Sequence, residues 1–271
     1  MIAFLGIIVF IFGCIIGSFL NVVILRYKTG RSIGGRSACF SCGTTLRAFE
    51  LVPVLSFIFS FGKCRSCKSS ISWQYPLVEL SSGIMFVIVF WKTLLDPSLT
   101  LASLIFFWFA FSILIVISVY DLKHKIVPDA MVFAFVFASF IWLILSHNIY
   151  YFASLRGVFD LLSGLILFFP FFILWYVSDG AWIGLGDGKL SIGLGFMLGL
   201  SGGISAIIMG FWIAAGISLI IIALQRFVMR GLPYLSGKTE VPFAPFLVLG
   251  ALIAFYYNLD LFQINTIFFG I

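Results

Sequence analysis

Apolar residues run along this chain in long blocks, and charged residues are largely confined to the segments between them. A helix needs about 20 consecutive apolar residues to cross a hydrocarbon core of about 30 Å. The blocks therefore predict an all-α membrane protein of about eight transmembrane helices. We expect these helices at residues 3–25, 77–95, 101–120, 130–148, 159–177, 188–201, 204–225 and 243–260.

The block that follows Asp187 is the shortest. We expect it to be broken at Ser201-Gly202-Gly203, and about 14 helical residues rise only about 21 Å. Either the bilayer thins there or Asp187 lies below the headgroups.

Composition supports a multi-pass membrane protein. Hydrophobic residues make up 62% of the chain and charged residues only 10%, with a mean hydropathy of +1.21. A soluble domain would carry about a quarter of its residues as charged side chains. The first block has neither a basic segment before it nor a convincing cleavage site. We therefore expect a retained first span rather than a signal peptide that is removed.

Basic residues orient the predicted bundle, because cytosolic loops are enriched in Lys and Arg. If the first span runs inward, only Lys92 and Arg156 lie outside. The net charge of +6 then follows from topology and attraction to anionic lipids, and no nucleic-acid partner is needed. The basic residues expected inside are Arg26, Lys28, Arg31, Arg36, Arg47, Lys63, Arg65, Lys68, Lys123, Lys125, Lys189, Arg226, Arg230 and Lys238.

Four cysteines lie in the long polar stretch between the first two predicted spans, at about residues 26–76. Cys39 and Cys42 form one C-x2-C knuckle, and Cys64 and Cys67 form another. Two such knuckles supply the four thiolates of a tetrahedral structural zinc site. The alternative is two disulfides or unrelated thiols, and the expected cytosolic position disfavours disulfides.

Two aspartates stand out because they lie beside long apolar blocks. Asp121 ends the block that begins at Leu101, and Asp187 follows Gly184-Leu-Gly186. Carboxylates at membrane depth are costly and usually functional. Two that face each other hold a single proton, so the ionised member can activate water while the protonated member polarises a carbonyl. Gly184 and Gly186 would let a substrate strand approach, although glycines of a simple turn would look the same.

Two other aspartates near the predicted cytosolic face could substitute in such a pair. Asp129 follows Pro128 at a predicted helix start, where a carboxylate is favoured for structural reasons. Asp179 falls in a predicted loop. We expect capping or solvated roles for both.

The ordered motifs resemble bacterial prepilin peptidases, the bifunctional type IV leader peptidases and N-methyltransferases. The resemblance runs nearly end to end. In that family the two catalytic aspartates correspond to Asp121 and Asp187. Ala244 stands where the family usually has glycine. The motifs are Gly17-Ser-Phe-Leu-Asn21, the two knuckles, Tyr75-Pro76-Leu-Val-Glu79, Asp121-Leu-Lys-His-Lys-Ile-Val-Pro128-Asp129, Gly184-Leu-Gly186-Asp187 and Pro242-Phe-Ala-Pro245.

The resemblance implies a bacterial cytoplasmic-membrane enzyme. It implies cleavage of the short basic leader of pilin-like substrates at the cytosolic face, then N-methylation of the new N-terminus by S-adenosylmethionine. Candidate residues for that cofactor are Asn21, Gly62 and Glu79. We expect a methyltransferase region at 1–98 and a six-helix peptidase domain at 99–271.

Two other functional classes remain open from the residues alone. One is a proton-coupled transporter with intramembrane carboxylates and a structural zinc loop. The other is a non-catalytic scaffold with a zinc-stabilised docking loop.

Overall fold

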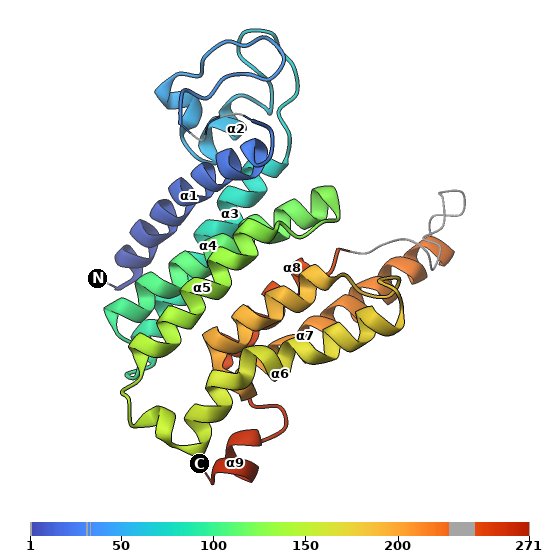
Figure 1. The fold of residues 1–271 in the computed structure, drawn as a ribbon. Helices are drawn as coiled ribbons and strands as arrows, with labels where there is room; N and C mark the ends of the chain where they lie inside the picture. Colours follow the sequence, from blue (N-terminus) through green and yellow to red (C-terminus); the bar gives the residue numbers. More distant parts are fainter. Residues whose placement is uncertain (1, 31, 33, 228–241, 271) are drawn as a thin grey trace. The chain divides into compact units, whose positions relative to one another are not determined.

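The computed structural model describes residues 2–30, 32, 34–227 and 242–270. Three of the basic residues used to orient the bundle, Arg31, Arg230 and Lys238, lie outside the described residues. The described chain is helical, with two isolated β-bridges in the loop that carries the cysteines. It divides into two compact units, Met1–Val119 and Tyr120–Ile271, and Figure 1 shows the elements of each. The predicted boundary after residue 98 stays a prediction.

The first unit is built on two long helices, α1 (Ile2–Arg26) and α3 (Gln74–Leu95). They approach closely because glycines lie where they meet. A Cβ built on Gly13 would lie 2.8 Å from Gly83 Cα, and one on Gly17 would lie 2.8 Å from Glu79 Cα. Small residues four apart are typical of helix contacts in membranes. The loop between these helices carries η1 (Ala48–Leu51) and α2 (Leu55–Phe59).

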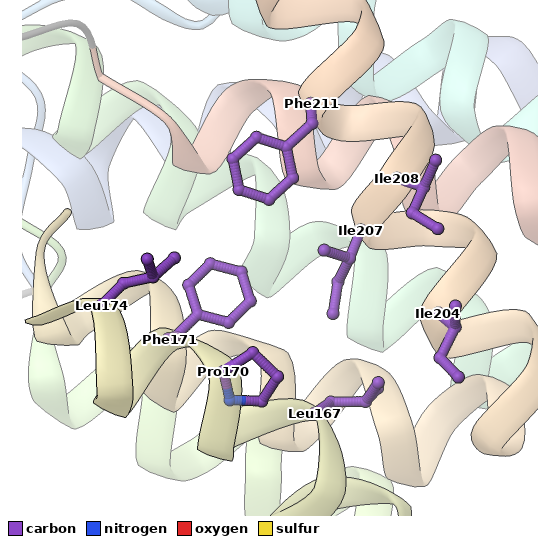
Figure 2. A pocket seen from close by; sticks show the side chains of 8 residues that line it. All are labelled: Leu167, Pro170, Phe171, Leu174, Ile204, Ile207, Ile208 and Phe211. Carbon is purple, nitrogen blue, oxygen red and sulfur yellow. The ribbon is translucent and has the colours of Figure 1, made fainter. Parts of the chain in front are cut away.

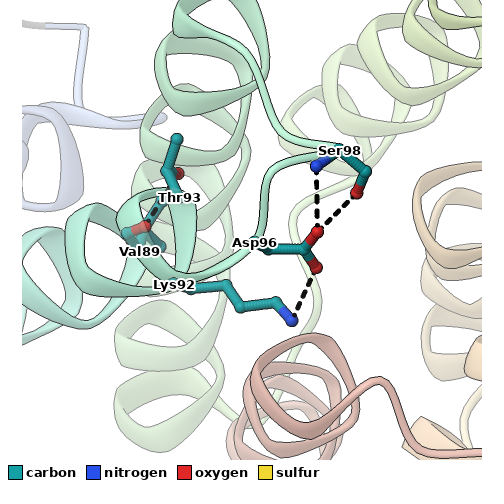
Figure 3. Close-up of polar contacts among 5 residues, drawn as sticks. All are labelled: Val89, Lys92, Thr93, Asp96 and Ser98. Carbon is teal, nitrogen blue, oxygen red and sulfur yellow. Dashed lines mark hydrogen bonds and ion pairs between the residues drawn. The ribbon is translucent and has the colours of Figure 1, made fainter.

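A polar cluster ends α3 at the side that we expect to face outward (Figure 3). Lys92 is buried, and its Nζ lies 3.0 Å from Asp96 Oδ2. The N–H of Ser98 donates to Asp96 Oδ1 at 3.1 Å. The paired carboxylate compensates the buried ammonium, as burial of a charge requires. α4 (Leu101–His124) follows and continues into the second unit.

The second unit contains α5 (Asp129–Ser146), η2 (Tyr151–Ala153), α6 (Leu155–Val177), α7 (Leu185–Phe227), α8 (Ala244–Tyr257) and α9 (Ile264–Phe269). α7 is folded back on itself at Gly199, whose φ of 71° and ψ of −179° are not helical. A Cβ on Gly203 would lie only 3.3 Å from Gly195 Cα, although eight residues of straight helix rise about 12 Å. α7 therefore has a first arm, residues 185–198, and a second arm, residues 200–227.

The fold-back corrects one expectation. The chain turns at Gly199, not at Ser201-Gly202-Gly203, because Gly199 adopts the left-handed φ that glycine tolerates best. The new helix start is capped from α6, where buried Asp160 Oδ1 accepts the Leu200 N–H at 2.8 Å. Tyr151 Oη donates to the other oxygen, Asp160 Oδ2.

Each of the eight predicted segments is helical in the structure, but not every one has the length of a full membrane span. Six helices of the described chain are long and apolar enough to cross a membrane: α1, α3, α4, α5, α6 and α7. The expected helices at 188–201 and 204–225 are the two arms of α7. The expected helix at 243–260 is α8, which has 14 residues and is shorter than the length of a full span.

An apolar cavity of about 160 Å³ lies between α6 and the second arm of α7 (Figure 2). Its walls contain aliphatic and aromatic side chains, with Phe171 of α6 and Phe211 of α7 stacked at a centroid distance of 6.2 Å. The cavity offers no group for acid or base chemistry. The lining residues are Leu167, Pro170, Phe171, Leu174, Ile204, Ile207, Ile208 and Phe211.

Candidate functional site

Asp121 lies in the last turns of α4, where the helix ends in Lys123 and His124. Its side chain is buried. The Ala244 N–H at the start of α8 donates to Asp121 Oδ2 at 3.1 Å. A free N–H at a helix N-terminus favours a negative partner. The carboxylate of Asp121 is therefore held by a segment more than 100 residues later in the chain.

Asp187 lies in the first turn of α7. Its side chain is also buried, and the two carboxylates are close enough to repel each other electrostatically. Among the described residues, Asp187 Oδ1 has no hydrogen-bond partner. Buried polar atoms are nearly always paired, so such an atom needs a proton, a water molecule or a bound group. The second unit thus brings together the two aspartates singled out by the sequence.

The two glycines before Asp187 have different surroundings. A Cβ on Gly186 would lie 2.7 Å from Cβ of Val127, in the segment between α4 and α5. Gly186 therefore lets the start of α7 pack against that segment. A Cβ on Gly184 would meet nothing nearer than Asp187 Oδ2, at 3.7 Å. Among the described residues, an added methyl group at Gly184 would therefore make only ordinary contacts.

Asp129 and Asp179 differ from this pair. Asp129 lies in the first turn of α5, and its Oδ1 is 2.7 Å from Lys189 Nζ. Lys189 lies two residues after Asp187, so the ion pair joins the starts of α5 and α7. Asp179 is exposed in the turn after α6, with a φ of 49°. The expected solvated role of Asp179 agrees with this exposure.

The main contact that sequence reasoning missed is the one between Ala244 and Asp121. The motif with Pro242 and Pro245 was recognised only by resemblance, with no role for its backbone. Proline near the first helical position is a signal for a helix start, and a helix start presents free N–H groups. That signal identifies a donor but not the carboxylate that it meets.

The four cysteines of the loop form one cluster in the first unit. Their sulfur atoms all lie within 4.8 Å of one another, and Cys39 Sγ is 3.8 Å from Cys67 Sγ. Tetrahedral zinc with Zn–S bonds of about 2.3 Å separates its sulfurs by about 3.8 Å. All five cysteines, including buried Cys14, are free thiols. The cluster could bind a metal ion such as zinc.

The backbone of the first knuckle favours thiolate at Cys39. The N–H groups of Cys42 and Ser41, together with the Ser69 hydroxyl, hydrogen bond to the sulfur and lower the pKa of the Cys39 thiol to about 6. A thiolate is the form that binds metals. The hydrogen bonds of the loop therefore favour the metal-binding form of Cys39.

The three residues suggested for S-adenosylmethionine all lie in the first unit. Asn21 and Glu79 are buried, and Asn21 Nδ2 donates to the Tyr75 carbonyl at 3.1 Å. Glu79 Oε2 accepts the Val54 N–H at 2.7 Å. Gly62 lies after α2 with a φ of 65°, and the Ile71 N–H donates to its carbonyl. Each of these contacts stabilises the start of α3 or the loop.

Two family models match this chain, one mainly in each unit. Residues 11–93 match the bacterial peptidase A24 N-terminal domain, and residues 108–222 match the type IV leader peptidase family. Among solved structures, none matches the chain.

Three relatives illustrate the extent of the similarity, and each is called a prepilin leader peptidase/N-methyltransferase. The Bacillus subtilis protein is 31% identical over 93% of this chain and 94% of its own length. The Burkholderia pseudomallei protein is 31% identical over 92% of this chain and 84% of its own length. The Pseudomonas aeruginosa protein is 28% identical over 89% of this chain and 87% of its own length. The chain therefore belongs to the bacterial peptidase A24 family of prepilin leader peptidases/N-methyltransferases.

Proposed function

We propose that this chain cleaves the leader from type IV prepilin-like substrates, with Asp121 and Asp187 as the catalytic pair. One observation carries the proposal. Two buried aspartates, at the end of α4 and the start of α7, interact electrostatically, and Asp187 Oδ1 has no partner among the described residues. The names of the relatives support a prepilin as substrate.

The chemistry follows from a carboxylate pair that shares one proton. The ionised member removes a proton from water as the water oxygen attacks the scissile carbonyl. The protonated member donates a hydrogen bond to the carbonyl oxygen. Collapse of the tetrahedral intermediate breaks the C–N bond, and the leaving amine takes a proton from the pair. The Ala244 N–H would hold Asp121 in position throughout.

Membrane orientation gives the expected position of the cut. The proposed enzyme is a multi-pass protein of the bacterial cytoplasmic membrane, with eight apolar helical segments and with α4 ending at the cytosolic face. The basic charges of the loops support this orientation. The scissile bond would lie just before the substrate's apolar helix. Phe171, which lines the apolar cavity, also lies against Gly188 beside Asp187, so an apolar surface adjoins the proposed pair.

We further propose N-methylation of the new N-terminus by the first unit. When bound, S-adenosylmethionine supplies an electrophilic methyl group. Asn21 and Glu79 carry a buried amide and carboxylate that fit a polar cofactor, and Gly62 is the third candidate. The four thiolates would hold one zinc ion that stabilises the loop.

The peptidase proposal is tested with purified enzyme and a prepilin bearing its leader. Asp121→Asn and Asp187→Asn should each lower cleavage by about a thousandfold or more, since an amide keeps the shape but cannot act as a base. The matched control is Asp179→Asn, an identical change at an exposed position where Asn tolerates the left-handed φ. The control should cleave normally. Robust cleavage by either Asp121→Asn or Asp187→Asn would contradict the mechanism.

The zinc proposal is tested by metal analysis of the reduced, purified protein. We expect close to one zinc ion per chain, and Cys67→Ser should lower that content and make residues 26–76 more sensitive to protease. Ser66→Ala, in the same knuckle but without a thiol, serves as the control. Absence of zinc from reduced parent protein would refute the assignment.

A further inference from the structure

The loop of the first unit carries an apolar face that points away from its own core. We call Val52, Leu55, Ile58, Phe59 and Phe61 the α2 apolar face. Leu55, Ile58 and Phe59 follow the i, i+3, i+4 spacing of one helix face. Their side chains are 51%, 57% and 79% exposed, and Phe61 is 88% exposed. Large apolar side chains exposed together on one helix face point to an interaction site.

The opposite side of α2 is used for packing against the loop and α3. Phe57 packs against Trp73, the residue before α3, with ring centroids 4.9 Å apart and ring planes tilted by 57°. Gly62 lies against the Phe57 ring, where a Cβ would be only 3.1 Å away. The inner side of α2 is therefore occupied, and the α2 apolar face is the side left for another partner.

One hydrogen bond relates the depth of α2 to that of α3. The Val54 N–H donates to Glu79 Oε2 at 2.7 Å, and Glu79 lies five residues after the first residue of α3. Five helical residues rise about 7–8 Å. Val54 keeps a φ of 63° at this contact, which is unfavourable for a β-branched residue. Figure 1 shows α2 beside the ends of α1 and α3. The α2 apolar face therefore lies level with the first turns of an apolar span.

The surroundings of this face match a membrane interface. Trp73 and Leu77, at the start of α3, are 69% and 60% exposed, so the span itself also begins with exposed apolar side chains. Trp is enriched at the boundary between membrane and water. Exposed basic side chains follow directly along the chain, and such groups attract anionic lipids. They are Lys63, Arg65 and Lys68.

We propose that the α2 apolar face inserts into the lipid headgroup region of the leaflet in which α3 begins. The partner is the membrane surface itself, and no second protein is required. A short helix with an apolar face and basic neighbours binds lipid in this manner. The four-cysteine loop would then be held at two points, by Glu79 and by the bilayer. This inference does not depend on the catalytic aspartates.

The test places a benzoylphenylalanine photo-crosslinker at position 59 of the full-length protein. The protein is reconstituted in vesicles of phosphatidylglycerol and phosphatidylcholine, illuminated and analysed by mass spectrometry. We expect lipid adducts at position 59 in several-fold higher yield than at position 40. Phe40 is the matched control, because it has the same side chain and is 66% exposed in the first knuckle.

A second variant keeps the experiment decisive. Ile58→Glu, combined with the probe at position 59, should lower the yield of lipid adducts several-fold, since a charged side chain on this face resists insertion. Limited proteolysis of residues 26–76 should match that of the parent and so exclude unfolding of the loop. Equal lipid yields at positions 59 and 40 would overturn the proposal. Adducts at position 59 to peptides from residues 120–271 or to a second copy, in place of lipid, would also overturn it.

Discussion

Asp160 and Asp187 are both buried carboxylates of the second unit, yet they have opposite surroundings. Both oxygens of Asp160 are occupied, one by the Leu200 N–H and the other by the Tyr151 hydroxyl. Asp187 Oδ1 has no partner among the described residues, and the neighbour of Asp187 is another carboxylate. Burial alone therefore does not identify a functional aspartate. What sets the proposed catalytic Asp187 apart from Asp160 is hydrogen-bonding capacity that the chain's own described groups leave unused.

The two regions also differ in what their helix starts do. At Asp160, the carboxylate caps the second arm of α7 after the turn at Gly199. At Asp121, the start of α8 supplies an N–H to a carboxylate that the proposed chemistry needs. The same interaction between a helix N-terminus and a carboxylate stabilises a turn in one region and positions a reactive group in the other.

The largest expected effect concerns the rate of cleavage. The double change Asp121→Asn with Asp187→Asn should cost about as much as either single change, a loss of about a thousandfold or more, because residues that act as one unit are not additive. Asp160→Asn should retain most of the cleavage rate per folded molecule. The measurement is the initial rate on a prepilin, normalised to the folded fraction. A double variant far slower than both single variants would show that Asp121 and Asp187 act independently, contrary to the proposed pair.

The next effect concerns stability. Asp160→Asn keeps only one acceptor oxygen for two donors and should lower the free energy of unfolding by about 1–3 kcal/mol. Tyr151→Phe removes one of the two hydrogen bonds and should cost less, about 1 kcal/mol. Thermal unfolding in detergent measures both changes.

Asp187→Asn serves as the comparison for stability, because it replaces a buried carboxylate with one oxygen that no described residue hydrogen bonds. This variant should unfold at or above the temperature of the parent. If Asp187→Asn proved less stable than Asp160→Asn, Asp187 would be the carboxylate that stabilises the fold, contrary to the proposal.

The sequence predicted the helical segments well, because apolar blocks in a membrane protein have few structural alternatives. The turn predicted at Ser201-Gly202-Gly203 was wrong because Gly199, Gly202 and Gly203 are all glycines, and contacts with α6, such as the one from Leu200 to Asp160, distinguish them. The Val54 contact with Glu79 and the Ala244 contact with Asp121 were not predicted. Both join segments far apart in sequence through a backbone N–H, which leaves no residue-type signal.

The smallest expected effects separate the two glycines before Asp187. Gly186→Ala would bring its Cβ within 2.7 Å of Val127 Cβ, and overpacking of this kind costs about 1–3 kcal/mol. It should reduce both stability and cleavage, because the start of α7 must move and carries Asp187 with it.

Gly184→Ala has ordinary contacts, with its nearest neighbour at 3.7 Å, so thermal stability should not change. If a substrate backbone lies beside Gly184, this variant should raise KM a few-fold with little change in kcat, as expected for lost ground-state binding. An unchanged KM in Gly184→Ala would show that the substrate does not bind on that side of Asp187. Unchanged stability in Gly186→Ala would show that the Val127 side chain moves to make room for the added methyl group.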